Sequence, residues 1–198
     1  MKISARKIIL CLLLVLLSFT CIADAAKMTL EEKRAELRNK VQSTLALCYE
    51  HYPEAKYTVE NGVGYAVFAN TGSHYGFFGN AHGRGMAINN QTGEEVFMKM
   101  SQLQLGVGVG IKEYSIVFVF TKPEAWQKFI ESKWSVDKSY SADASDGVSG
   151  GSSDGAIHCG KGVLAYQFTT KGVALELSLG GIRYVKDKSY YPKEKKKK

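Results

Sequence analysis

Alternating apolar and polar residues mark the middle of the chain, where Leu103 to Ile111 carries Leu, Val or Ile at every second position. A period of two places these side chains on one face of a β-strand. The other face holds Gln104 and the glycines Gly106, Gly108 and Gly110. Each glycine inside a strand costs roughly 0.5–1 kcal/mol relative to alanine, so we expect a close approach to this bare face by a packed element, with a ligand as the alternative.

Further strand patterns lie on both sides of this stretch. They are Val63 to Ala69, Tyr75 to Phe78, Gly85 to Asn89, Glu95 to Met100, Ser115 to Phe120, Gly162 to Thr169 and Val173 to Leu179. Turn residues at 89–93 and 170–172 separate two pairs of them, and a polar break at 112–114 separates another. Short strands at this spacing predict an antiparallel, meander-like sheet in an α+β fold.

Two segments have the period of a helix. Thr29 and Glu32 form a capping-box pattern, and an apolar stripe then continues to a stop at Pro53. Arg34 and Arg38 fall along the edge of this stripe, which suits a helix that covers a sheet and also a helix that meets an anionic membrane surface. A second, short helix is predicted from Thr121 to Ile130. We expect the two helices to cover the sheet.

The first residues have the pattern of a secretory signal peptide. Lys2, Arg6 and Lys7 precede an apolar stretch that is shorter than a membrane-spanning helix needs, and Ala23 to Ala25 offers an A-x-A cleavage site. We therefore predict a signal peptide at 1–25, a single domain at 26–185 and a basic, flexible tail at 186–198. The serine- and glycine-rich segment 139–155 is predicted to be a mobile loop.

Charge is concentrated at the C-terminus. The net charge of the whole chain is +7, and the tail from Lys186 to Lys198 contributes +5 of it. Without the signal segment the rest of the chain is neutral by count, so the basic balance does not indicate a nucleic-acid groove. The run Lys195, Lys196, Lys197 and Lys198 is typical of a solvated end, or of an electrostatic tether to anionic lipid.

Candidate chemistry is sparse. The segment Gly155 to Lys161 fits G-x-x-x-x-G-K, but Gly162 stands where a phosphate-binding loop needs Ser or Thr, and a strand pattern follows. Neither a nucleophile motif nor a metal-ligand spacing is present, so we predict a protein that is not an enzyme and has no cofactor or metal. Cys48 and Cys159 are left open as a disulfide pair or as free thiols.

Four stretches, in this order, resemble the SYLF domain family, whose yeast and animal members are also described as an actin-binding domain. They are Gly62 to Ala69, the glycine-rich piece Gly76 to Gly85, Leu103 to Phe129 with its L-Q-L-G start and T-x-E-A helix, and Lys171 to Gly181. The resemblance covers roughly Asn61 to Val185. The sequence departs from the family pattern at Glu176, at Gly180 and after Asp137.

The resemblance implies lipid binding, because eukaryotic members associate with membranes through basic residues of an N-terminal amphipathic helix. The corresponding basic residues here are Lys33, Arg34, Arg38 and Lys40. A signal peptide separates the chain from cytosolic actin, so actin binding is not transferred. Signal-bearing members of the family are typically bacterial and exported.

These observations favour a non-enzymatic module that binds the surface of anionic phospholipid membranes, exported to the periplasm or cell envelope. The predicted lipid-binding residues are the four basic helix residues together with Lys195 to Lys198. The alternative is a structural or protein-interaction domain of the envelope, in which the bare glycine face docks a protein partner. A nucleic-acid partner is not expected.

Overall fold

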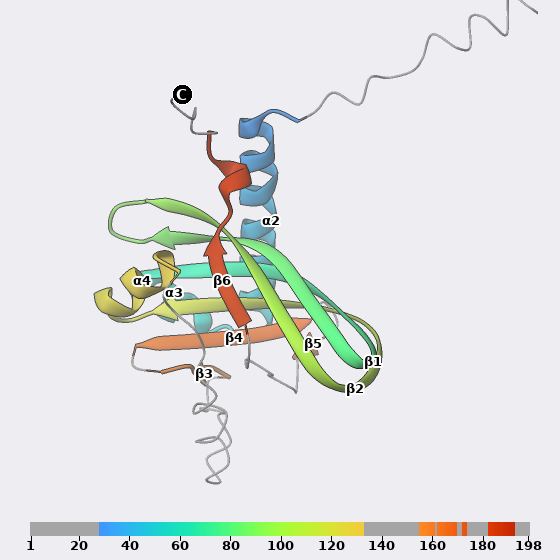
Figure 1. Cartoon of the computed structure of the whole chain (residues 1–198). Helices are drawn as coiled ribbons and strands as arrows, with labels where there is room; N and C mark the ends of the chain where they lie inside the picture. The colour runs from blue at the N-terminus through green and yellow to red at the C-terminus, as the bar shows by residue number, and fades with distance from the viewer. Residues whose placement is uncertain (1–27, 133–154, 161, 170–171, 174–181, 193–198) are drawn as a thin grey trace, which may run out of the picture.

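The computed structural model describes residues 28–132, 155–160, 162–169, 172–173 and 182–192, with backbone alone for 74–78, 103–112 and 172–173. Within these residues, six strands form one sheet in which every pairing is antiparallel (Figure 1). The predicted α+β class is confirmed. In chain order the elements are α2 (Leu30–His51), α3 (Ala55–Asn61), β1 (Gly64–Asn89), β2 (Glu95–Phe120), α4 (Pro123–Ile130), β3 (Ile157–His158), β4 (Val163–Thr169), β5 (Gly172–Val173), β6 (Ile182–Lys186) and the 3₁₀ turn η1 (Lys188–Tyr190).

The short strands predicted between Val63 and Phe120 are in fact two long ones. β1 and β2 each contain 26 residues and pair from Gly64 opposite Phe120 to Ile88 opposite Glu95. The polar break predicted at 112–114 does not interrupt β2, because the neighbouring strand supplies the backbone hydrogen bonds whatever the side chains are. The register shifts once, between Gly76 and Phe78, which is the site of a bulge or irregularity.

The β1–β2 hairpin is curled back on itself. A straight strand of this length would measure about 85 Å, which is far longer than a domain of this size is wide. Figure 1 shows both strands turning at one side of the molecule, so that the second half of the hairpin crosses the first. At the crossing, Gly83 and Gly85 lie against the backbone of Ala69 and Val67, with no room for a side chain. Glycine is therefore required there by close backbone approach.

Each face of the sheet is buried in its own hydrophobic cluster. Alternate residues of β1 and β2, such as Phe68 and Phe118, fill the interior of the curl together with Trp126 and Phe129 of α4. The intervening residues, such as Val67 and Val117, pack with α2 and α3 in the second cluster. The sequence prediction of a sheet covered by two helices is confirmed, and α3 is an additional helix that begins directly after Pro53 and Glu54.

Helix α2 matches its prediction closely. Thr29 is the N-cap of a complete capping box with Glu32, and the buried residues are Leu37, Val41, Thr44, Leu45 and Cys48. The short predicted helix is α4, whose N-cap is Lys122 instead of Thr121. α2 begins where its capping box places it, whereas Lys122 makes no side-chain capping bond and the start of α4 is marked by Pro123 in its first turn.

The C-terminal part of the sheet is built on β2. β4 pairs with Ser115 to Phe120, and β6, which the sequence did not predict, pairs with Met98 to Gln102. β5 pairs with the end of β4, as the predicted hairpin requires. The remainder of that predicted strand, the loop at 139–154, the signal segment and Lys193 to Lys198 lie outside the described residues.

The folded domain does not end at Val185 as predicted. β6 continues to Lys186, and the chain then forms η1 beside the N-terminal half of α2, where Tyr190 is buried (Figure 1). The segment was predicted to be a flexible tail because it is rich in lysine. That prediction was wrong for Lys186 to Tyr190, because the tyrosines of the segment pack on the sheet.

Candidate functional site

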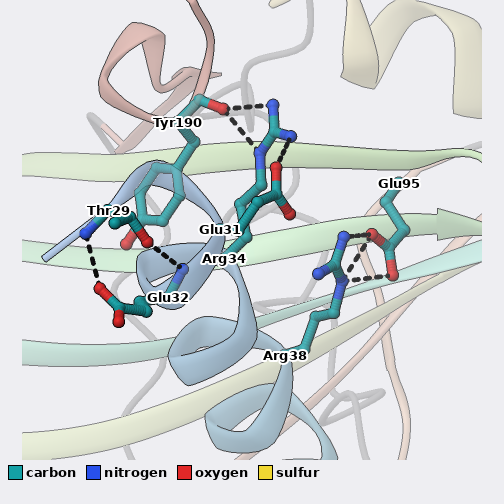
Figure 2. Close-up of polar contacts among 7 residues, drawn as sticks. All are labelled: Thr29, Glu31, Glu32, Arg34, Arg38, Glu95 and Tyr190. Atoms are coloured by element: carbon teal, nitrogen blue, oxygen red, sulfur yellow. Dashed lines mark hydrogen bonds and ion pairs between the residues drawn. The ribbon is translucent and has the colours of Figure 1, made fainter.

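The basic residues of α2 do not form a free cationic face. Arg34 donates from Nε and Nη2 to the backbone carbonyl oxygen of Tyr190, at 2.9 and 2.7 Å, and from Nη1 to Glu31 at 2.7 Å (Figure 2). Its guanidinium lies 5.4 Å from the ring centre of Phe97 and 5.9 Å from that of Tyr191. Arg34 therefore joins α2 directly to the C-terminal end of the fold, to a residue 156 positions later in the sequence.

Arg38 is held by a carboxylate of β2. Its Nε lies 2.9 and 3.1 Å from the two carboxylate oxygens of Glu95, and Nη2 lies 2.8 Å from one of them (Figure 2). This hydrogen bonding, opposed in part by burial, raises the pKa of Arg38. The guanidinium also lies 5.6 Å from the ring centre of Phe97. Arg34 and Arg38 thus converge on one aromatic ring from successive turns of α2.

The other predicted lipid-binding residues are placed differently. Lys40 is exposed on α2, and Lys33 is half-buried. Lys195, Lys196, Lys197 and Lys198 lie outside the described residues. The structure brings together Arg34 and Arg38, but it does so in intramolecular contacts that leave their guanidinium groups already bound.

The C-terminal segment from Asp187 to Tyr191, here called the strap, completes this site. The ring of Tyr190 stacks on Phe97 with centres 5.2 Å apart and planes 6° apart. The backbone N–H of Phe97 donates to the hydroxyl of Tyr191 at 3.0 Å. Sequence reasoning missed the strap, although two adjacent tyrosines before a lysine run were a sign of packing.

Asp187 fixes the shape of the strap. Burial disfavours the charge of Asp187, but hydrogen bonds from the side chain and backbone of Ser189, helped by Arg84 and Lys99, outweigh this effect and lower its pKa. The two hydrogen bonds measure 2.8 and 3.0 Å. Arg84 Nε lies 3.5 Å from the other carboxylate oxygen. The ionised form of Asp187 is therefore the one that caps η1.

Replacing Asp187 with Asn should lower the free energy of unfolding at neutral pH by about 1–2 kcal/mol, because hydrogen bonds to a charged group are weakened. The folded-state pKa lies below the ordinary value of 3.8, so this stabilisation is fully present above 3.8 and is lost as the pH falls through the lower value. Urea unfolding at neutral pH and near pH 2 measures the difference. A destabilisation that is equally large at both pH values would contradict the role of the charge.

The interior of the curl contains neutral polar groups. Tyr114 donates to Gln102 at 3.4 Å, and burial raises the pKa of Tyr114 to about 12 and that of Tyr184 well above its usual value. Burial also raises the pKa of the Cys48 and Cys159 thiols to about 12. Both cysteines are free, and they lie in different hydrophobic clusters. Protonated thiols and phenols at these positions are poor nucleophiles at neutral pH.

The part of the chain that the structure describes has neither a metal-binding cluster nor a membrane-spanning helix. No group of three or more His, Cys, Asp or Glu side chains is arranged to hold a metal ion in this part of the chain. Among the same residues, every helix is too short or too polar to cross a bilayer.

Comparison with known proteins gives a weak similarity. The chain is 28% identical over 162 residues to a protein of Aeromonas veronii named Beta cell expansion factor A, and this alignment covers 81% of the chain. It covers 59% of the relative, so the chain spans less than two thirds of that protein's length. No family model matches the chain.

Proposed function

We propose that the chain is a non-enzymatic, SYLF-type module that binds the surface of anionic phospholipid membranes after export to the periplasm or cell envelope. The observation that carries this proposal is the site around Phe97, where two guanidinium groups and two tyrosines surround one aromatic ring. Arginines and aromatic residues together suit the interface between lipid headgroups and acyl chains.

The basic residues that follow the strap in the sequence support the same proposal. The strap precedes the lysine-rich end of the sequence, and it lies beside the N-terminal half of α2, the half that contains Lys33 and Arg34 (Figure 1). Each Lys or Arg near an anionic membrane contributes about 1 kcal/mol to binding, so several cations that reach the same membrane give an appreciable affinity.

The SYLF assignment is supported by the agreement between its motifs and the fold. The four resembling stretches begin β1, cross its curled middle, run through β2 into α4, and reach β5. The similarity to the Aeromonas veronii protein extends over most of the chain. Its name describes an effect on beta cells and mentions no ligand, so the lipid proposal depends on the residues of this chain.

Flotation of the protein, without residues 1–25, on vesicles of phosphatidylcholine with or without phosphatidylglycerol tests the proposal. We expect binding to the anionic vesicles alone, and at least about a tenfold loss of affinity when Lys195 to Lys198 are all replaced by Gln. Replacing Lys33 and Lys40 with Gln should weaken binding more than replacing Lys122 and Lys128, which removes equal charge from around α4.

Equal binding to neutral and anionic vesicles, or affinity unchanged by all of these substitutions, would contradict the electrostatic mechanism. Absence of binding to either vesicle would exclude the lipid function and favour the envelope protein-interaction alternative.

A further inference from the structure

We propose that the strap, Asp187 to Tyr191, is an autoinhibitory cover over Arg34 and Phe97, and that an anionic phospholipid surface takes its place on them when it is released. This inference rests on the proposed lipid function and specifies how the same surface is regulated. Without release of the strap, each of the three guanidinium nitrogens of Arg34 already donates a hydrogen bond to a protein atom.

The contacts under the strap are those that a lipid headgroup and its interface would replace. A phosphate oxygen is a stronger acceptor for a guanidinium than the Tyr190 carbonyl oxygen, because its charge adds to the hydrogen bond. The ring of Phe97, which is 3% exposed beneath Tyr190, would become available to the acyl-chain boundary. The remaining partner of Arg34, Glu31, has a largely exposed side chain, and an exposed ion pair of this kind is weak.

The strap has the features of a segment that opens locally. It contains a single 3₁₀ turn, and it contacts the body mainly through Arg34, Phe97 and Arg84. Asp187 and Tyr190 are buried, but opening of the strap breaks only these contacts and leaves the pairing of the sheet intact, which is the pattern of a local opening rather than of global unfolding. The lysines that follow the strap are attracted to the same anionic surface, so binding of the tail would draw the strap away from α2.

Flotation on vesicles of phosphatidylcholine and phosphatidylglycerol tests the proposal with variants that loosen the strap. Asp187→Asn should bind about fivefold more tightly than the unmodified protein. Loosening the strap makes the Arg34 guanidinium available, and one additional cation at the membrane surface has an effect of about this size. Glu124→Gln on α4 is the matched control. It changes the net charge by the same amount, but on an element outside the strap. Tyr191→Phe removes only the hydroxyl that holds the Phe97 N–H, so it should strengthen binding without any change in charge.

Substitutions of Arg34 distinguish release of a covered lipid-binding residue from a general loss of protein stability. Arg34→Gln should bind at least about fivefold more weakly than Arg34→Lys, because both lose the paired bonds to Tyr190 and only the lysine keeps the charge. The double variant Asp187→Asn/Arg34→Gln should bind no better than Arg34→Gln alone. Thermal unfolding of each variant verifies that it is folded at the assay temperature.

The outcomes separate the two proposals. If the unmodified protein binds anionic vesicles but Asp187→Asn behaves like Glu124→Gln and Tyr191→Phe gives no gain, the strap is not a cover and the lipid function stands. A gain from Asp187→Asn that persists in full with Arg34→Gln would also overturn the cover. If none of these proteins binds anionic vesicles, the lipid function itself fails.

Discussion

Replacing Phe129 with Ala is expected to lower the free energy of unfolding by about 3–5 kcal/mol. Phe129 is completely buried at the end of α4, and its ring centre lies between 4.8 and 6.2 Å from those of four other aromatic rings. These rings belong to Phe68, Phe118, Phe120 and Tyr184. Because they come from β1, β2 and β6, they cannot all close in on the space left by the missing ring.

Denaturant unfolding of Phe129→Ala and Lys128→Ala measures this effect with a matched control. Lys128 is the preceding residue of α4 and is exposed, so its replacement should change stability by about 0.5 kcal/mol at most. Phe129→Leu should recover much of the loss, since a large apolar side chain partly fills the cavity. If Phe129→Ala were within about 1 kcal/mol of Lys128→Ala, the ring would not be the centre of the interior cluster.

Replacing Gly85 with Ala is expected to cost about 3 kcal/mol or more of unfolding free energy, because a methyl group there forces the backbone to move. The added Cβ would overlap the carbonyl oxygen of Val67 and the ring of Phe68. Both neighbours are buried, and Val67 is also fixed in register opposite Val117, so neither can yield without separating the two halves of the hairpin. The substitution therefore tests the curl itself.

Gly93→Ala is the control for this prediction. Gly93 has a φ of +69° in the turn between β1 and β2, but nothing lies within 4 Å of an added Cβ. Its replacement should cost about 1–2 kcal/mol from backbone strain alone. Equal losses at the two glycines, measured by urea unfolding, would contradict the close crossing that the structure assigns to Gly85.

Local features of the fold were predictable because they depend on short sequence patterns. The capping box at Thr29 and Glu32 placed the start of α2, and the apolar stripe predicted the buried side chains Leu37, Val41 and Leu45. The turn at 89–93 predicted the chain reversal between β1 and β2, which pair antiparallel. Strand lengths were wrong, because polar residues such as Lys112 and Glu113 were taken as a break.

The candidate site was predictable only in part. Arg34 and Arg38 were singled out by their position along the stripe of α2, and the structure does bring them together around Phe97. Their partners were not predicted, because Glu95 lies 57 residues and Tyr190 lies 156 residues away in the sequence. Such pairs form only because the curled sheet places β2 and the C-terminal segment beside α2.

The sequence by itself determined the α+β class, the antiparallel pairing, and the ends and buried face of α2, since helix and strand periods are set by residues within a few positions of each other. The tertiary structure alone decided that two strands form one hairpin curled on glycines, and that the strap covers Arg34. Those features arise from contacts between residues that are distant in the sequence. Such contacts stabilise the fold only after the entropic cost of closing the intervening loop has been met.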